Sequence, residues 1–394
     1  MSTLKVDAIR HNSATSDAIT TAADGTCTAR ITGMTGGGGL SHRNIIINGA
    51  MNVAQRGVSS TSTGFGSVDR FQISYSGTDE APTQAQASVA SGTTPYSLGF
   101  RKSFKITNGN QTSGAGATDH IQTIYTIEDQ DLATSGWNYT SSSSYVTLSF
   151  YIKSSIAQNF YFYLQSDNGS QYRYVMETGS LSADTWTKVT KTISGNSNIV
   201  LNSDNGVGMY LVYSLFDGTD RTGSRPLNAW AALDNTSRTP DQTSTWYTTN
   251  DSTWEITGVQ LEVGDTATSF EHRSYDEELK RCKRYALVIG SNQAIGTGSA
   301  YNSTNININI YNQFRATPTY SKTTGGNGYT WVVYVGSSGV ATASPTVAVA
   351  SDSNPNYCLR LYVQNCHNSL TAGQAVWALT HDGGGEQIVF SAEL

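Results

Sequence analysis

Short runs of alternating apolar and polar residues recur along the middle of the chain. Large apolar side chains alternate with threonine, serine, tyrosine and lysine at 146–153, and the same period of two returns at 160–164 and 209–215. A period of two is that of a β-strand with one buried face. A short apolar run at 45–47 is expected to be buried as well. Turn-forming Ser, Gly and Asn stretches separate these runs without intervening helices, so residues 41–273 are predicted to form an antiparallel sandwich of the jelly-roll type.

The same alternation predicts a second, smaller antiparallel β-domain at 287–394. Asparagine alternates with isoleucine at 305–310, which is typical of a strand with one buried face. Pro318 ends this pattern. Further strands are predicted at 329–335, 357–364, 375–379 and 387–390.

A strand and a short helix connect the two β-regions. In the strand at 254–263 the apolar phase slips by one residue at Gly258, which indicates a β-bulge. The helix is predicted over 274–286, with Ser274 as its cap and Glu277 completing a capping box. One apolar stripe runs along this helix and consists of Tyr275, Leu279, Cys282 and Ala286. Because so short a helix is marginal alone, the stripe is expected to pack against another surface.

Residues 1–40 contain only scattered large apolar side chains, among them Leu4, Val6 and Ile9. A segment with so little apolar surface is expected to become ordered only against a partner or against other copies of itself. The glycine run at 36–39 is interpreted as a flexible link, because no GK[ST] follows that would make it a phosphate-binding loop.

The composition of the 394-residue chain favours β-structure and limits the classes of partner. Only 14% of the residues are charged, whereas 22 Tyr, 11 Phe and 7 Trp are too many for a disordered chain. The net charge of −6 argues against nucleic acid or an anionic membrane as the main partner, because phosphate binding needs clustered Lys and Arg. No run reaches the roughly 18 apolar residues of a membrane span, and the N-terminus lacks the apolar core of a signal peptide. The chain is therefore expected to be made in a cytoplasm, without membrane insertion.

No pattern in the sequence points to catalysis, so we expect no catalytic residue and no enzyme activity. The six histidines have no partner at ligand spacing, and no G-x-S-x-G is present. Among the four cysteines, only Cys358 and Cys366 are close enough in sequence to consider as a disulfide. No metal or other cofactor is expected, although Asp217, Asp220 and Asp234 leave a structural calcium ion as an alternative.

Several stretches of the sequence resemble bacteriophage tail fibre and receptor-binding proteins. They are GVQLEVG and TATSFEHRSYDEELKRCKRYA within 254–286, NIIINGAMNVAQRG at 44–57 and VDRF at 68–71. The N-terminal STLKVDAIRHNSATSDAITTAADGT is similar to the tail-attachment segment of fibres from phages of cyanobacteria and related marine bacteria. The resemblance covers roughly residues 1–290 and implies a homotrimeric tail fibre of the virion.

Together, the resemblance and the residue pattern predict one role for each part of the chain. Residues 1–40 would attach to a tail adaptor or nozzle protein through Leu4, Val6 and Ile9. Residues 41–273 would form a body similar to a carbohydrate-binding module, and 274–286 a helical collar that holds three copies together. Residues 287–394 would recognise a host surface polysaccharide or lipopolysaccharide.

Sugar recognition uses aromatic faces against the C–H surface of the ring, with polar groups for the hydroxyls. The terminal domain has Tyr329, Trp331, Tyr334 and Tyr357 close to Gly- and Asn-rich stretches, and a HDGGG loop at 381–385. The predicted receptor-binding residues are Tyr329, Trp331, Tyr357, His381 and Asp382. A core position is the alternative for Trp331 and Tyr357, because large aromatic residues dominate small β-cores. A plain turn is the alternative for 381–385.

Two other functions stay open at this point. One is a glycan-cleaving enzyme of the tailspike type, although the internal repeats of a long β-helix are missing from the sequence. The other is a purely structural fibre whose tip contacts another virion protein.

Overall fold

The computed structural model describes residues 6–10, 15, 17–21, 23, 27–29, 42–323, 328–342, 345–349, 358–382 and 385–394. Nearly all of its regular structure consists of antiparallel β-sheets, with four short helices in the described chain. The all-β fold predicted from the sequence is therefore confirmed. None of the helices within these ranges has the length and apolar character needed to cross a membrane.

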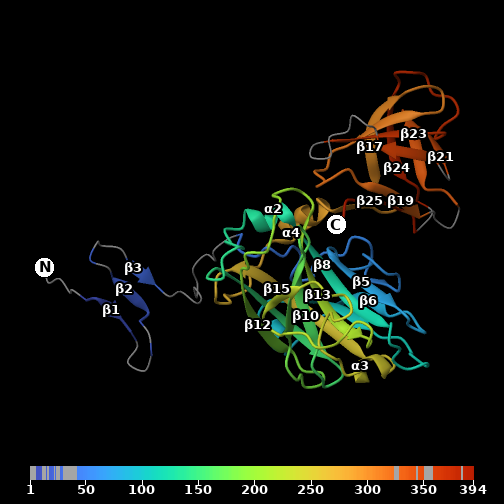
Figure 1. The fold of residues 1–394 in the computed structure, drawn as a ribbon. Coiled ribbons are helices and arrows are strands. Elements are labelled where there is room, and N and C mark those ends of the chain that lie inside the picture. Colours follow the sequence, from blue (N-terminus) through green and yellow to red (C-terminus); the bar gives the residue numbers. More distant parts are fainter. Residues whose placement is uncertain are drawn as a thin grey trace.

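A small N-terminal sheet lies apart from the rest of the chain (Figure 1). Its three strands are β1 (Ala8–Ile9), β2 (Ile19–Thr21) and β3 (Cys27–Ala29). Val6 and Ile9 are exposed, with 41% and 54% of their surface accessible. Leu4 and the glycine run at 36–39 lie outside the described residues.

The first large unit is a sandwich of two six-stranded antiparallel sheets (Figure 1). One sheet has the order β14 (Trp230–Ala232), β11 (Tyr172–Glu177), β10 (Tyr161–Ser166), β13 (Val207–Asp217), β8 (His120–Glu128) and β5 (Phe71–Ser76). The other has the order β12 (Thr187–Ser194), β9 (Tyr145–Ser154), β15 (Thr253–Val263), β7 (Lys102–Thr107), β6 (Thr83–Ser88) and β4 (Ser59–Ser60). Strands distant in the sequence are neighbours in both sheets, as in a jelly roll.

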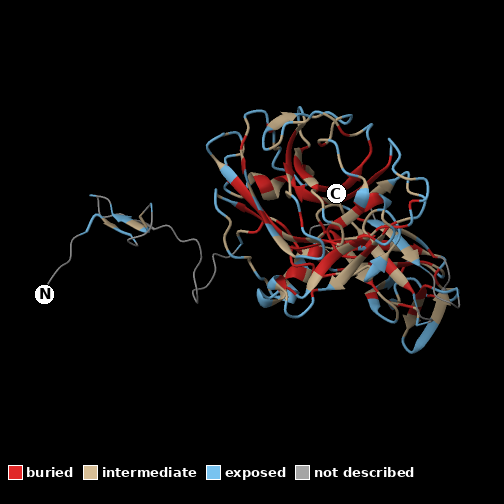
Figure 2. Cartoon of the chain, turned by 90° about the horizontal axis from the view of Figure 1, so that it is seen from below, coloured by how far each residue is buried: buried red, intermediate tan, exposed pale blue. Residues whose placement is uncertain are grey.

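The core of this sandwich lies between the two sheets, where the buried residues concentrate (Figure 2). The alternating residues of β9 point inward as predicted, and Phe150 packs edge-on against Phe162 and Tyr213 at 5.1 Å between ring centroids. The apolar run at 45–47 is also largely buried, but it forms a turn rather than a strand.

The phase slip at Gly258 is a β-bulge, as the sequence predicts. The register between β15 and β9 shifts between Thr257 and Gln260, and Gly258 has a φ of +64°. A side chain at this position would place its Cβ 2.6 Å from Cζ of Phe100. Both the backbone conformation and the space therefore require glycine here.

Replacing Gly258 by alanine should lower the free energy of unfolding by about 2–4 kcal/mol, because backbone strain and overpacking add. Urea denaturation measures the loss. Gly179→Ala is the matched control: its φ is +75° and nothing lies within 4 Å of the added Cβ. That variant should lose only the backbone contribution of about 1–2 kcal/mol. Equal losses in the two variants would rule out a contribution from Phe100.

The helices are short and lie at the ends of strands. Three of them are α1 (Thr94–Ser97), α2 (Asp129–Ala133) and α3 (Thr245–Thr248), none of which the sequence analysis anticipated. The fourth, α4 (Tyr275–Lys283), begins after the predicted cap, where Oγ of Ser274 accepts a hydrogen bond from the Glu277 amide at 3.2 Å. The Glu277 side chain forms an ion pair with Arg281 at 3.0 Å.

The second large unit consists of a three-stranded and a seven-stranded antiparallel sheet. The smaller sheet has the order β16 (Ala286–Ile289), β25 (Gln387–Ser391) and β19 (Thr319–Thr323). The larger has the order β21 (Ser338–Thr342), β20 (Trp331–Val335), β24 (Ala375–Thr380), β17 (Ala294–Ala300), β18 (Ile306–Ile310), β23 (Leu359–Gln364) and β22 (Thr346–Val349). This unit, called the tip domain below, has its own hydrophobic core from Ile289 to Ala392.

A buried ion pair connects the tip domain to the sandwich. Arg70 is 1% exposed, and its guanidinium lies 3.5 Å from the ring centroid of Tyr285 and 5.2 Å from that of Tyr125. It forms an ion pair with Glu393, which also pairs with Arg56 at 3.2 Å. Burial opposes the charge of Arg70, but the Glu393 carboxylate raises the pKa of Arg70 above its ordinary value.

Further polar contacts extend this junction on both sides of Tyr285. The Tyr285 hydroxyl donates to Glu128 at 2.7 Å, and Arg284 pairs with the same carboxylate at 2.6 Å. In the tip domain, Arg315 donates to the carbonyl of Asn205 in the sandwich at 3.1 Å. The two units are thus joined by a network of charges and carbonyls as well as by the chain itself.

Candidate functional site

The outer face of the seven-stranded sheet is open to solvent and carries aromatic and polar side chains. The strands of this sheet alternate strictly: Val333, Ala378, Ile308 and Leu361 are buried in the core of the tip domain. The residues between them point to the opposite face, because successive side chains of a strand alternate across a sheet. This outer face is called the tip face below.

Strand register places five side chains of the tip face in one row across the sheet. Tyr334 of β20 is opposite Trp377 of β24, and Trp377 is opposite Thr297 of β17. Thr297 is in turn opposite Asn309 of β18, which is opposite Arg360 of β23. With neighbouring strands about 4.8 Å apart, the row spans about 19 Å, which is the scale of an oligosaccharide rather than of a single sugar.

The aromatic end of the row is a stacked pair of rings. Tyr334 and Trp377 lie 4.4 Å apart between centroids with an angle of 20° between their planes, and Trp377 keeps 38% of its surface exposed. A Cβ at Gly339, on the neighbouring strand, would lie 2.6 Å from the Tyr334 ring. The glycine therefore lets the Tyr334 ring lie close against β21. An exposed indole held in place by a second ring is a rigid apolar platform at low entropic cost.

The other end of the row is polar. Asn309 is half-buried and Arg360 is exposed, and a second row on the same face continues from Asn307 to Tyr362. Tyr301 packs edge-on against Tyr362 at 5.4 Å and is 60% exposed. Amide, guanidinium and phenol groups can donate to and accept from hydroxyl groups. The tip face therefore combines an aromatic platform with hydrogen-bonding groups on one flat surface.

The structure does not bring the five predicted receptor-binding residues together. Trp331 is fully buried, and its indole N–H donates to the Tyr320 hydroxyl at 2.9 Å, so its prediction as a binding residue is wrong and the core alternative holds. Trp331 starts β20 on the core side, where a large aromatic residue fills a small β-core. Tyr357 lies outside the described residues.

Tyr329, His381 and Asp382 form a separate corner at one end of β20 and β24. The rings of Tyr329 and His381 are 5.4 Å apart, and Nδ1 of His381 is 3.6 Å from the Asp382 carboxylate. Tyr329 is 41% exposed and the Asp382 side chain 75% exposed, whereas His381 is largely covered. The corner is about five residues, or roughly 16 Å along the strand, from the Tyr334–Trp377 pair.

The sequence analysis named Tyr334 but did not select it, and it missed Trp377. In AVWALT the residues on both sides of the strand are apolar, so alternation alone does not show which face is exposed. The signal that was present is the pairing of two aromatic residues, one in each of two strands with polar residues in the neighbouring strand. Arg360 between two leucines is a second such signal, because a charge within an alternating run marks the solvent face.

The helix α4 does not present the predicted collar stripe to other chains. Cys282 is 1% exposed and packs with Ile47, Val53 and Tyr285 of its own chain, and burial raises the pKa of its thiol. Ala286 is fully buried and belongs to β16 rather than to the helix. The assignment of these two residues to a trimer interface is therefore wrong, because the sandwich already covers that side of the helix.

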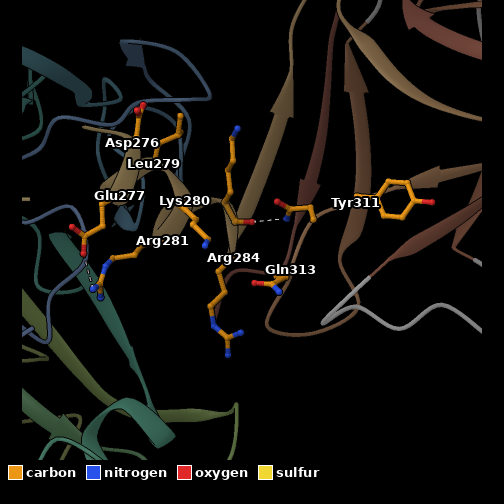
Figure 3. A pocket seen from close by; sticks show the side chains of 10 residues that line it. Asp276, Glu277, Leu279, Lys280, Arg281, Arg284, Tyr311 and Gln313 are labelled. Carbon is orange, nitrogen blue, oxygen red and sulfur yellow. Dashed lines mark hydrogen bonds and ion pairs between the residues drawn. The ribbon is translucent and has the colours of Figure 1, made fainter. Parts of the chain in front are cut away.

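The other side of α4 faces an open groove. A cavity of about 900 Å³ lies between the helix and the segment 311–313 of the tip domain (Figure 3). The amide of Asn312 donates to the Lys283 carbonyl at 2.8 Å, and the Tyr311 ring extends away from the helix. Leu279 lines this groove and Tyr275 is 56% exposed, so these two predicted interface residues keep accessible surface.

Neither the calcium alternative nor the disulfide finds a site in the described part of the chain. The Asp217 carboxylate is buried and accepts hydrogen bonds from Gln122 at 2.7 and 2.8 Å. Within the described residues no group of three or more His, Cys, Asp and Glu side chains could hold a metal ion. Cys358 and Cys366 are both free thiols.

No protein-family model and no curated protein matches the chain in sequence. Among solved structures, the enzymatically active domain of tailspike protein 4 of bacteriophage CBA120 is 12% identical over 56% of this chain and 21% of that chain, with a TM-score of 0.30. The CBM22-1 xylan-binding domain of Paenibacillus barcinonensis Xyn10C is 11% identical over 50% and 87%, with a TM-score of 0.24. A family 30 carbohydrate-binding module is 10% identical over 56% and 88%, also at 0.24. These similarities are remote, so function is argued below from the site itself.

Proposed function

We propose that the protein is a non-enzymatic bacteriophage tail fibre that adsorbs to a host cell-surface glycan through the tip face. The observation that carries this proposal is the exposed Tyr334–Trp377 pair, aligned with Thr297, Asn309 and Arg360 in one row. Aromatic faces bind the C–H surface of sugar rings, and the polar part of the row can bind their hydroxyl groups. The sequence resemblance of residues 1–290 to phage fibres supports the setting of a virion.

The test uses the full-length chain, fluorescently labelled, on susceptible bacteria. We expect saturable binding that surface polysaccharide or lipopolysaccharide from the same cells inhibits, and a corresponding loss of phage adsorption. Binding that persists after removal of surface glycans would contradict glycan recognition. Failure of a folded chain to bind cells would favour the purely structural fibre. Incubation with the polysaccharide should produce no new reducing ends, whereas their release would indicate the glycan-cleaving enzyme.

Attachment to the virion tail is proposed for the N-terminal segment. The small sheet β1–β3 lies apart from the sandwich, and Val6 and Ile9 are exposed (Figure 1). Deletion of residues 1–40 should therefore leave the melting temperature within about 2 °C of the full chain, because no core contact is removed. The same deletion should abolish incorporation into virions, measured by immunoblot of purified particles. Particles that still contain the truncated chain would disprove the assignment.

We further propose that the fibre is a homotrimer with α4 near the subunit interface. Only Tyr275 and Leu279 of the original stripe have surface to contribute. A single sugar site with a Kd of about 1 mM is worth about −4 kcal/mol, whereas linked sites raise apparent affinity by roughly 10² to 10⁴ fold. Sedimentation equilibrium should give three times the 42.2 kDa chain mass. Tyr275→Asp should shift it towards the monomer, and an unchanged trimer in that variant would place the interface elsewhere.

A further inference from the structure

The sandwich has a second open surface that the proposed function does not use. A groove of about 320 Å³ lies on the outer side of the sheet containing β10, β11 and β13, beside the loop at 218–238. Register places Tyr210, Gln165 and Arg173 in one row across β13, β10 and β11. This surface, called the arginine groove below, is on the side of the sheet away from the core.

Arg173 lies at the floor of the groove and is bound only by neutral groups. Its guanidinium donates to Oε1 of Gln165 at 2.7 and 3.2 Å and to the Asp234 carbonyl at 3.0 Å. It also lies 4.4 Å from the ring centroid of Tyr163. The residue is 1% exposed, so its charge is largely removed from water without a carboxylate to balance it.

A second guanidinium, that of Arg238, lines the same groove with donors to spare. Its terminal nitrogen is 3.5 Å from Oε1 of Gln122, and its Nε is buried without a hydrogen-bond partner. Arg225 likewise has a buried Nε without a partner, and its terminal nitrogen donates to the carbonyls of Ala231 and Ala232. Unsatisfied buried donors are rare in proteins and call for an acceptor.

The charges around the groove act on one another. Arg221, from the same loop, donates to the Thr118 carbonyl. Burial, followed by the positive charges of Arg221 and Arg238, lowers the pKa of His120 to about 4. Burial and the charges of Arg225 and Arg238 also lower the pKa of Arg173. Within the described chain, none of these four arginines makes an ion pair with a carboxylate within 4.0 Å.

The nearby carboxylates are engaged with other groups. Asp217 is buried and bound by Gln122 and Ser214. Asp167 accepts from Gln171 at 2.9 Å, and Asp234 accepts from Thr236 at 2.7 Å. The guanidinium groups are therefore left to bind an anion from outside the chain, and the planar fork of an arginine fits a carboxylate in a bidentate arrangement.

We propose that the arginine groove binds a carboxylate-bearing sugar of an acidic polysaccharide, with Arg238 as the direct ligand of the carboxylate. The half-buried Tyr210 and the amides of Gln165, Gln171 and Asn235 line the same groove. They supply an apolar edge and hydrogen-bonding groups for the sugar ring, which a bare inorganic anion would leave unused. This site is separate from the tip face and belongs to a different domain.

Calorimetric titration of the full-length chain with trigalacturonate tests the proposal, with neutral galactotriose as the comparison. Trigalacturonate should bind, galactotriose should bind at least about tenfold more weakly, and added salt should weaken only the first. Arg238→Gln should weaken trigalacturonate binding by about tenfold or more, and Arg238→Lys by less, since charge remains but the fork is lost. Tyr210→Ala, at a half-buried position, provides a second variant if Arg238→Gln does not fold.

Two control variants separate this site from other causes. Arg281→Gln removes an exposed arginine of α4 and should leave trigalacturonate binding unchanged. Trp377→Ala alters the tip face alone, so it should leave trigalacturonate binding by the sandwich intact whatever it does to cell binding. Equal affinity for the acidic and neutral trimers, or full binding by both Arg238→Gln and Tyr210→Ala, would overturn the proposal. Tighter binding of a sulfated trisaccharide than of trigalacturonate would overturn the carboxylate assignment.

Discussion

Replacing Glu393 by alanine is expected to lower the free energy of unfolding by about 3–5 kcal/mol, because it leaves a buried guanidinium without its counterion. Arg70 is 1% exposed and lies between the rings of Tyr125 and Tyr285, so water cannot solvate it without opening the junction. Its terminal nitrogen would keep only the Thr126 carbonyl, at 2.6 Å, as a hydrogen-bond acceptor. Chemical denaturation monitored by tryptophan fluorescence measures the loss.

Two further variants define what that loss means. Glu277→Ala removes a partly exposed ion pair with Arg281 and should cost no more than about 0.5 kcal/mol. The double variant Arg70→Met, Glu393→Leu should recover most of the stability, since apolar residues of similar size can replace a buried ion pair. A loss below about 1 kcal/mol for Glu393→Ala would show that the junction is open to solvent.

The second large effect is expected at the tip face. Trp377→Ala should weaken binding of the full-length chain to its surface glycan by about 30-fold or more, since a central aromatic anchor typically contributes at least about 2 kcal/mol. Stability should change by no more than about 1 kcal/mol, because Trp377 is 38% exposed and loses only its stacking on Tyr334. Flow cytometry of labelled protein on susceptible cells measures the binding.

The matched control for this variant is Tyr311→Ala. Tyr311 is an aromatic residue of the same domain, 73% exposed and outside the tip face. Its removal should leave cell binding unchanged. If the two variants bind equally, the aromatic platform is not the recognition surface, and the corner of Tyr329, His381 and Asp382 becomes the next candidate.

Local pattern was sufficient to predict those parts of the fold that depend on neighbouring residues. The alternation at 146–153 determines which side of β9 is buried, and the phase slip at Gly258 corresponds to a single bulge. The Ser274 cap was equally predictable, because a hydroxyl three residues before Glu277 reaches its amide within one turn. These signals need no knowledge of the rest of the chain.

The remaining features depend on contacts between distant parts of the chain. The apolar stripe of α4 was visible in the sequence, but only the structure shows that Ile47 and Val53 cover Cys282. Arg70 and Glu393 are 323 residues apart, so no local pattern could pair them. Trp331 and Trp377 each lie in an apolar strand, and only the strand register shows that one faces the core and the other solvent.

The Arg70–Glu393 junction also determines how force passes through the molecule. The chain enters the tip domain at Ala286, and the end of β25 returns to the sandwich where Glu393 contacts Arg70 and Arg56. The tip is therefore held at two points, one covalent and one ionic. A single attachment would act as a swivel, whereas two resist rotation. A pull on the tip is then transmitted to the body as tension and torque, and a bound surface can orient the particle that carries the fibre.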